Sequence, residues 1–231
     1  MIYITGDKHG SIQSILEFTD LNHTTKEDIL IILGDAGYNY YGNKKDTRRK
    51  EALSKLPITL FCIHGNHEKR PYDIPTYKEV EFHGGIAYME EEYPNLYFAK
   101  DAEVYNFNGN SCIVIGGAYS VDKYFRMSMG YQWFSNEQPD ENVKNAIFSA
   151  LFKRGNEIDV ILSHTCPQKY EPVEMYLGNI DQSTVDKSTE EFLDGLEDVV
   201  AYKRWYCGHW HTDKEVDKIK FMYHGIEEFN P

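Results

Sequence analysis

The chain has 231 residues, 41% hydrophobic and 26% charged, which is typical of a globular protein with one large α/β domain or two small ones. Its formal net charge of −13 disfavours long duplex nucleic acid as a partner, because such binding depends on Lys and Arg at the phosphates. No apolar run approaches the ~20 residues of a membrane span, and no signal-like segment precedes the first strand-like residues. We therefore expect a cytoplasmic protein whose four cysteines are buried, reduced thiols.

Short apolar runs rich in β-branched residues recur along the chain and predict strands covered on both faces. They lie at 2–5, 29–34, 58–63, 112–117, 159–164, 203–208 and 219–224. Helix-favouring stretches lie between them, at 11–21, 45–56, 141–154 and 188–200. Strand alternating with helix predicts an α/β layered sandwich. Because no repeat or low-complexity linker interrupts the pattern, residues 1–231 are expected to form a single domain.

The predicted helices carry boundary patterns of their own. Ser11 is a candidate N-cap of the first helix, and Pro57 ends the second. Gly155 is the expected stop of the third helix. In the last helix, Ser188 and Glu191 have the spacing of a capping box.

Two segments are predicted to be loops. Residues 36–45 are rich in Gly, Asn and Tyr, whereas residues 118–141 are long, aromatic and irregular. Loops of this length in a compact domain are often functional. The aromatic side chains of the second loop could form a stacking wall for a base or sugar, or a small core that holds the loop down. They are Tyr119, Tyr124, Phe125, Tyr131, Trp133 and Phe134.

Polar side chains follow five of the predicted strands at the point where each strand ends. The segments are 6-GDKHG-10, 34-GD-35, 64-HGNHE-68, 163-SH-164 and 207-CGHWH-211. In open α/β sheets, ligands collect at the carboxyl ends of strands. The candidate metal ligands in these segments are Asp7, His9, Asp35, Asn66, His164, His209 and His211. Packing alone does not explain so many ligand-type residues at successive strand ends.

The residue types indicate a specific chemistry. Mixed oxygen and nitrogen ligands without thiolate suit manganese, iron or zinc. Two metal ions held close together need a bridging group, and such a pair can activate water for an in-line phosphoryl displacement. In the last segment, residues two apart in a strand lie on one face. His209 and His211 are therefore expected to point to the same side, with Trp210 facing the core.

Taken in order, the five segments resemble the motifs of the calcineurin-like metallophosphoesterase superfamily over residues 6 to 211. The resemblance implies a four-layer αββα sandwich with a dinuclear metal site at the carboxyl ends of the strands. It also implies two divalent metal ions, with manganese favoured and iron or zinc as alternatives.

The resemblance further implies two ligand sets joined by a bridging carboxylate. The first set is Asp7, His9 and His211, and the second is Asn66, His164 and His209. Asp35 would bridge the two metals, and a hydroxide between them would attack phosphorus. His67 would lie outside the metal shell and act as the general acid that protonates the leaving oxygen.

One departure from the superfamily pattern concerns the second motif. Many relatives, notably protein Ser/Thr phosphatases, read GD-x-x-D-R-G, where the second Asp orients the catalytic His and the Arg grips phosphate. This chain has Tyr38 and Asn39 in those places, which disfavours a protein phosphatase. His67 therefore lacks its usual partner, and Glu68 is a candidate by proximity.

Phosphate would then be gripped by another cation. Arg126 in the long loop and Arg48 or Arg49 in the basic helix are the candidates, unless they are solvated surface charges. The tyrosines that follow Asp35, Tyr38 first among them, are expected to border the pocket mouth. Arg126 and Tyr38 are therefore the predicted substrate-binding residues.

The remaining histidines are predicted to lie outside the metal site. His64 is expected to pack beside it. Residues 83-HGG-85 match a phosphatase motif in letters, but no strand run precedes them, so we expect His83 in a loop or turn. His23 and His224 have no ligand-like context and are expected to be structural.

The predicted function is hydrolysis of a small or nucleotide-type phosphodiester, with no membrane partner. The alternatives are a phosphomonoesterase acting on a protein or small molecule, and a non-catalytic binding scaffold of the same fold. Scaffold-type relatives tend to lose ligands or the catalytic His, and this chain keeps all of them, which favours an active enzyme.

Overall fold

Two β-sheets packed face to face form the centre of the structure, a computed structural model that describes residues 1–231. The first sheet has seven strands in the order β13 (Ile226–Glu228), β1 (Ile2–Thr5), β2 (Ile29–Ile32), β3 (Thr59–Cys62), β6 (Leu96–Ala99), β5 (Gly85–Glu90) and β4 (Tyr77–Phe82). The second has six strands in the order β11 (Lys214–Val216), β12 (Ile219–Phe221), β10 (Arg204–Cys207), β9 (Val160–Ser163), β8 (Asn110–Ile115) and β7 (Val104–Phe107).

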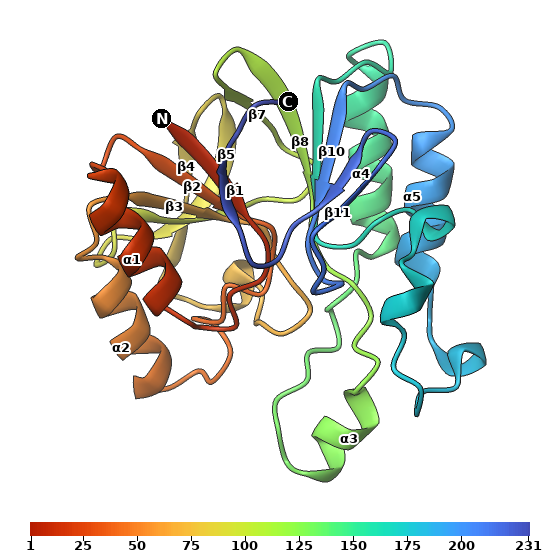
Figure 1. The fold of residues 1–231 in the computed structure, drawn as a ribbon, viewed down its shortest axis with the longest axis horizontal. Helices are drawn as coiled ribbons and strands as arrows, with labels where there is room; N and C mark the ends of the chain where they lie inside the picture. Colours follow the sequence, from red (N-terminus) through yellow and green to blue (C-terminus); the bar gives the residue numbers. More distant parts are fainter.

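Helices cover the outer faces of both sheets, so the layers run helix, sheet, sheet, helix (Figure 1). On the first sheet they are α1 (Gln13–Asn22) and α2 (Lys44–Leu53), and on the second α4 (Glu141–Phe152) and α5 (Ser188–Glu197). The short helix α3 (Lys123–Ser128) stands away from this sandwich, on a long excursion between β8 and α4 (Figure 1). Four 3-10 helices lie at Pro71–Asp73, Gln168–Tyr170, Val173–Met175 and Gln182–Thr184. The predicted α/β class is confirmed.

The strand β2 shows why its sequence is an unbroken apolar run. Side chains alternate across a strand, so a strand between two layers needs apolar residues at every position. Ile29 and Ile31 belong to the core between the two sheets, whereas Leu30 and Ile32 pack outward with Ile15 of α1. All four residues of β2 are buried, and β3 and β9 show the same pattern.

Parallel pairing brings the functional strand ends together. β1, β2, β3 and β6 run parallel in the first sheet, and β8, β9, β10 and β12 run parallel in the second. The carboxyl ends of β1, β2 and β3 therefore lie at one edge of their sheet. Those of β9 and β10 lie at one edge of the other sheet.

All seven apolar runs are strands, and six further strands were not predicted from the sequence. These are β4, β5, β6, β7, β11 and β13, which are mostly hairpin strands with solvent-facing positions or short edge strands. The prediction that no strand precedes residues 83–85 is wrong, because β4 ends at Phe82 and turns there into β5.

The predicted helices are confirmed with shifted ends, but two of the predicted caps are wrong. Ile12, not Ser11, occupies the N-cap position of α1, without a side-chain cap. Ser188 is the first residue of α5 and not its cap, so the capping box does not form. The 118–141 segment is not all loop, since it contains α3.

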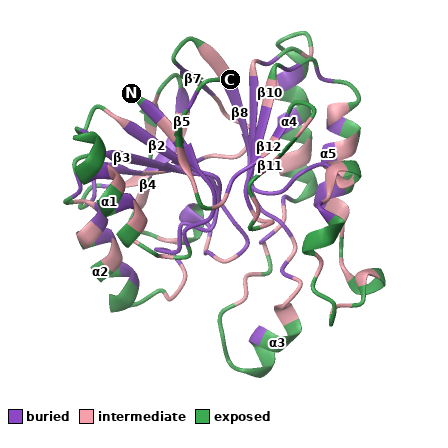
Figure 2. Cartoon of the chain, viewed as in Figure 1, coloured by how far each residue is buried: buried purple, intermediate pink, exposed green.

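The four cysteines are free and buried, as predicted. The central strands β1, β2, β3, β9 and β10 are buried along most of their length, whereas the α3 excursion is mostly exposed or intermediate (Figure 2). None of the helices combines the length and the apolar character that crossing a membrane requires.

Candidate metal centre

Three strands of the first sheet deliver polar side chains to one place. β1 leads into Asp7 and His9, β2 into Asp35, and β3 into Asn66 and His67. His9 lies between the first two groups, with Nε2 3.8 Å from Asp7 Oδ2 and Nδ1 3.9 Å from Asp35 Oδ2. The loops that follow these strands therefore place both carboxylates around one imidazole.

The second sheet completes the cluster from its own strand ends. His211 Nε2 lies 3.3 Å from Asp7 Oδ2 and 2.9 Å from His9 Nε2. His164, which follows β9, places Nε2 2.8 Å from Asn66 Oδ1 and 3.9 Å from Asp35 Oδ2. Ligand-type atoms of both sheets thus converge in the gap between their carboxyl edges.

Three overlapping groups of residues each bring three ligand atoms within 4.8 Å of one another. They are Asp7, His9 and His211; Asp7, Asp35 and His164; and His9, Asp35 and His67. The first group coincides with the set expected for one metal. His209 belongs to none of the three groups, although its ring packs against that of His164, with centroids 5.0 Å apart.

The residues fit metal ions because a buried oxygen lacks a protein partner. Asp7 is buried, and its Oδ2 atom has no hydrogen-bond donor, whereas its Oδ1 atom accepts the backbone N–H of His209 at 2.8 Å. An unpaired buried carboxylate oxygen is costly. A cation bound between Asp7, His9 and His211 would remove that cost.

The backbone around the cluster is strained. His9, Asp35, His209 and His211 all have positive φ, at 46°, 47°, 66° and 49°. Such conformations are uncommon for residues other than glycine, cost free energy, and gather at functional sites. Gly65 is also required here, because a Cβ atom at this position would collide with Asp35.

The protonation of the cluster suits metal binding. His164 Nδ1 lies 2.8 Å from the carbonyl oxygen of Leu33, which places a proton on Nδ1 and directs Nε2 toward Asn66 and Asp35, where a metal ion would bind. Burial and the neighbouring His164 hold the pKa of His209 well below its usual value, which favours the neutral ligand form. Burial opposes ionisation of Asp7, but His164 and His211 outweigh it and lower its pKa.

His67 lies beside this cluster, with a partner that was not predicted. Its backbone N–H donates to Asp35 Oδ1 at 2.8 Å, and its Nε2 atom is 3.9 Å from Oδ1 of Asp122. Asp122 comes from the α3 excursion, far from the motif in which relatives carry the orienting Asp. The sequence offers no signal for it beyond the presence of an acidic residue in the long loop.

Glu68 is not the partner of His67, which corrects the proposal by proximity. Its carboxyl group is fully buried and accepts the backbone N–H groups of Gly65 and Gly37, at 3.0 and 3.3 Å. Burial raises the pKa of Glu68 to about 8. Glu68 thus braces the loop that follows β3.

Of the three candidate cations, Arg126 is linked to the cluster through one side-chain hydroxyl, although it is not among the residues that line the neighbouring cavity. Its side chain is buried, and Nη1 donates to Ser120 Oγ at 3.2 Å. The same oxygen lies 2.8 Å from Nδ2 of Asn66, so one hydroxyl separates Arg126 from the cluster. Its Nε and Nη2 atoms have no protein acceptor. Arg49 is occupied elsewhere, donating to the carbonyl oxygen of Gly37 at 2.6 Å, and Arg48 is exposed on α2.

Tyr38 does not border the pocket, which corrects the prediction of a substrate contact. It is 1% exposed, and its hydroxyl group pairs with Sγ of Cys62. Its ring packs against Phe98 in the core between the first sheet and its helices. The predicted position failed because the chain turns inward directly after Asp35.

The 207-CGHWH-211 segment reaches the centre by a route different from the predicted one. β10 ends at Cys207, and His209 and His211 are both in the left-handed region, so strand alternation does not align them. Trp210 packs against the core of the second sheet and donates to Thr165 Oγ1 at 3.2 Å, but it also lines the cavity beside the centre.

The other histidines lie outside the cluster, as predicted. His64 is buried with Nε2 2.9 Å from the carbonyl oxygen of Glu68. His83 lies in the exposed turn between β4 and β5, His23 ends α1, and His224 pairs with Asp213 at 2.9 Å.

A cavity of about 310 Å³ opens beside the centre. His9, Asp35, Asn66 and His67 form part of its wall, together with His209 and His211. The rest of the wall comes from the α3 excursion and from the segment between β9 and α5. This is the size range of small-molecule sites.

Two solved structures are similar to the chain. The crystal structure of TT1561 of Thermus thermophilus aligns with a TM-score of 0.50 at 12% identity, covering 96% of this chain and 87% of that one, which shows a shared fold. The protein of unknown function AQ665 from Aquifex aeolicus aligns with a TM-score of only 0.36 at 14% identity, covering 74% of this chain and 81% of that one. No curated protein is significantly similar to the chain.

The family of the chain follows from a match that covers most of its length. The model of the calcineurin-like phosphoesterase family matches residues 1–213, which include every segment of the cluster. The chain therefore belongs to the calcineurin-like phosphoesterase family, a family of metal-dependent phosphoester hydrolases.

Proposed function

We propose that the chain hydrolyses a small or nucleotide-type phosphodiester, using two divalent metal ions, with manganese as the favoured metal. The observation that carries this proposal is the buried Oδ2 atom of Asp7, which accepts no hydrogen bond although ring nitrogens of His211 and His9 lie 3.3 and 3.8 Å away. When bound, the ions would activate a water and neutralise charge on the phosphoryl oxygens. Asp7, His9 and His211 would hold one ion, and Asn66, His164 and His209 the other, with Asp35 between them.

His67 is the proposed general acid. It lines the cavity at the edge of the cluster, where it can donate a proton to the leaving oxygen. Asp122 faces its Nε2 atom at 3.9 Å and keeps the imidazole directed into the cavity. Burial and the nearby Arg126 lower the pKa of His67, although Asp35 opposes them.

Arg126 is the proposed phosphate contact. Two of its nitrogens have no acceptor in the protein, and a buried guanidinium with free N–H groups can donate to a phosphoryl oxygen. The α3 excursion thus supplies both functions that relatives place after the second motif: Asp122 beside the acid and Arg126 beside the phosphate.

A diester is favoured over a monoester because the wall beyond the centre is largely apolar. The second ester group of a diester would contact these apolar side chains, whereas the additional negatively charged oxygen of a monoester would have no partner among them. A phosphomonoesterase acting on a small molecule or a protein is the alternative. The free thiols and the small cavity support a small cytoplasmic substrate.

The test is hydrolysis of bis-p-nitrophenyl phosphate and p-nitrophenyl phosphate by the manganese-loaded protein. The diester should be turned over faster, and Asp35→Asn should lose about 10²-fold or more in rate. His67→Ala should lose about as much with a phenyl diester, whose leaving group needs a proton, and less with the p-nitrophenyl diester. His83→Ala is the matched control, because this histidine lies in an exposed turn away from the cluster. Equal rates for the wild type and the two site variants would favour a non-catalytic scaffold, and a faster monoester would favour the phosphatase.

A further inference from the structure

Two excursions beyond the sandwich enclose a trough that starts at the candidate metal centre. One is the α3 excursion (residues 118–141), and the other is the segment 165–187, between β9 and α5. A second hollow of about 480 Å³ continues outward from the 310 Å³ cavity. The two hollows share six wall residues, so they form one trough: Tyr119, Val121, Asp122, Leu177, Ile180 and Val185.

The walls of this trough are apolar where it leaves the centre. Val121, Leu177, Ile180 and Val185 present aliphatic side chains to it. Leu177 is 53% exposed, although it lines the trough, so its apolar surface is open to a ligand. Contiguous apolar side chains that stay accessible beside a polar site are typical of a binding groove.

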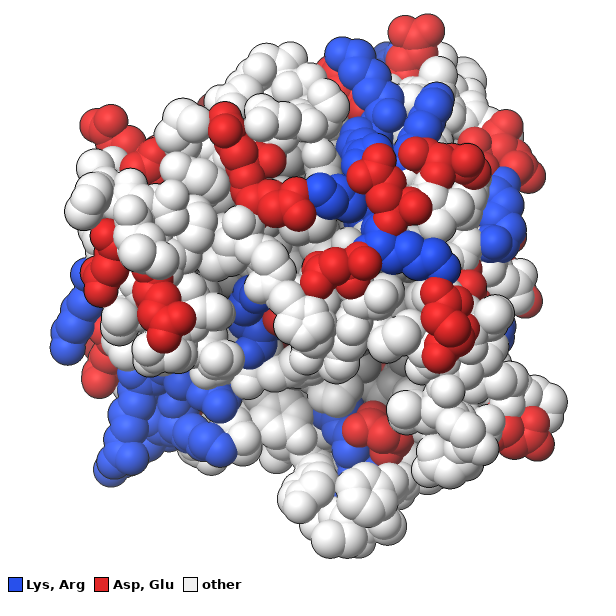
Figure 3. All heavy atoms as spheres, viewed as in Figure 1, with Lys and Arg blue, Asp and Glu red and all other residues white.

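The charges along the trough exclude a second anionic group. Lys187 is the only Lys or Arg on its walls, and it is engaged by Glu171 at 2.6 Å and by the hydroxyl of Tyr176 at 3.0 Å. Acidic residues outnumber it, with Asp122, Asp181, Glu171 and Glu190 on the walls. In Figure 3, the surface over the α3 excursion, at the lower centre, is mostly uncharged. A further phosphate or carboxylate would find no partner there.

Aromatic rings add a flat surface to the trough. Tyr176 and Trp210 both line it, with ring centroids 5.9 Å apart and planes tilted by 30°. Tyr119 lies in the shared wall, and Tyr124 and Phe125 line the outer part. Flat, uncharged π-systems bind such surfaces with a geometry that a flexible alkyl chain lacks.

We propose that this trough binds an uncharged aromatic ring system, on the scale of a nucleobase, carried by the phosphoester whose phosphorus lies at the metal centre. The proposal rests on the proposed function, since it names the group that the substrate carries beyond the reacting phosphate. Leu177, Ile180 and Val185, together with Tyr119 and the Tyr176–Trp210 pair, would then determine specificity.

The test measures binding and not turnover, so it stays informative if the protein proves inactive. Calorimetry on the manganese-loaded protein compares 1-naphthylmethylphosphonate, octylphosphonate and methylphosphonate, which share one anionic head. The naphthyl compound should bind about tenfold or more tightly than the methyl compound, because burial of its rings removes apolar surface from water. It should also bind more tightly than the octyl compound.

Leu177→Asp places a carboxylate in the trough at an exposed position that folding does not depend on. This variant should lose most of the naphthyl advantage and keep its affinity for methylphosphonate. Val173→Asp is the matched control, since Val173 is 65% exposed in the same segment but does not line the trough.

Three results would overturn the assignment. They are equal affinity for the naphthyl and methyl compounds, tighter binding of the octyl compound, and an undiminished naphthyl advantage in Leu177→Asp. Failure of the proposed function is a separate result: no diester turnover while the naphthyl preference persists. In that case the trough remains an aromatic site beside an inactive centre.

Discussion

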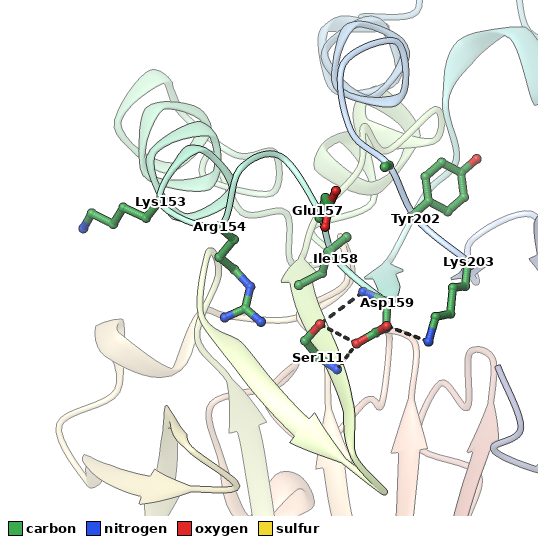
Figure 4. Close-up of a pocket in the computed structure, with 9 residues that line it drawn as sticks. Ser111, Lys153, Arg154, Glu157, Ile158, Asp159, Tyr202 and Lys203 are labelled. Atoms are coloured by element: carbon green, nitrogen blue, oxygen red, sulfur yellow. Dashed lines mark hydrogen bonds and ion pairs between the residues drawn. The ribbon is translucent and has the colours of Figure 1, made fainter.

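The two ends of the central strands of the sandwich both carry a carboxylate, but the two carboxylates differ in whether their oxygens have hydrogen-bond partners. At the amino ends, Asp159 accepts the N–H and hydroxyl groups of Ser111, at 2.8 and 2.7 Å, and Lys203 Nζ lies 2.8 Å from its other oxygen (Figure 4). At the carboxyl ends, Asp7 is buried with one oxygen unpaired. The first carboxylate is satisfied by the protein, and the second is not.

The difference teaches how to separate structural from functional polar groups at strand ends. Asp159 ties the starts of β8 and β9 together, and both of its carboxylate oxygens have protein partners. The Asp7 cluster instead combines an unpaired oxygen with four left-handed residues, both of which cost stability without a ligand. A binding free energy must offset those costs, so the comparison predicts that metal stabilises one end and leaves the other unchanged.

The largest expected effect is on metal-dependent stability. Manganese at about 100 times its dissociation constant should stabilise the wild type by about 2.7 kcal/mol, which raises the melting midpoint by roughly 5–10 °C for a chain of this length. Asp7→Asn should reduce the shift by the contribution of the ion that Asp7, His9 and His211 would hold. Thermal unfolding with and without manganese measures this. An unchanged shift in Asp7→Asn would remove Asp7 from the metal site.

The matched control for this experiment is Asp159→Asn. It removes a carboxylate of the same size from the other end of the sandwich, so it should keep the full manganese shift. In the presence of EDTA no metal shift is measured, and the two variants should instead differ in their free energy of unfolding. Asp159→Asn should lower the free energy of unfolding more than Asp7→Asn does, because it breaks the ion pair with Lys203, whereas Asn at position 7 keeps the Oδ1 contact to the His209 N–H.

A smaller effect is expected at the edge of the centre. Asp122→Asn should lower the rate of diester hydrolysis by about tenfold for an alcohol-like leaving group, which needs a proton from His67. A p-nitrophenyl leaving group needs little protonation, so its rate should change less. A purely structural role for Asp122 would instead lower both rates equally. Steady-state kinetics with phenyl and p-nitrophenyl diesters distinguishes these outcomes.

The expected control here is the neighbour Lys123. Its Nζ atom lies over the Trp133 ring, 4.1 Å from the centroid, and it does not line the cavity. Lys123→Gln changes one charge in the same short helix and should leave the ratio of the two rates unaltered. A changed ratio in this variant would mean that the α3 excursion as a whole, and not the Asp122 carboxylate, controls the acid.

The two ends also differ in how far the sequence predicts them. The convergence of the residues at the carboxyl ends is predictable because each follows an apolar run, and parallel strands end at a common edge. The positions of Asp122 and of the buried Arg126 side chain could not be predicted from the sequence, since both residues lie on an excursion whose path depends on tertiary packing. Tyr38 was misplaced for the same reason: the sequence shows that a tyrosine follows Asp35, but not which way the chain turns.

The smallest expected effect concerns the pH dependence of the amino-end contact. Hydrogen bonds from Lys203 and Ser111 lower the pKa of Asp159 below its ordinary value. A lowered folded-state pKa means that the stabilisation is fully present above about pH 4, the unfolded value, and is lost as the pH falls through the folded value. Asp159→Asn should therefore cost about 1 kcal/mol at pH 7 and progressively less below about pH 4. Urea unfolding in EDTA at pH 7, 4 and 3 measures the difference, and a cost that grows on acidification would show that Asp159 is not held by these ionic contacts.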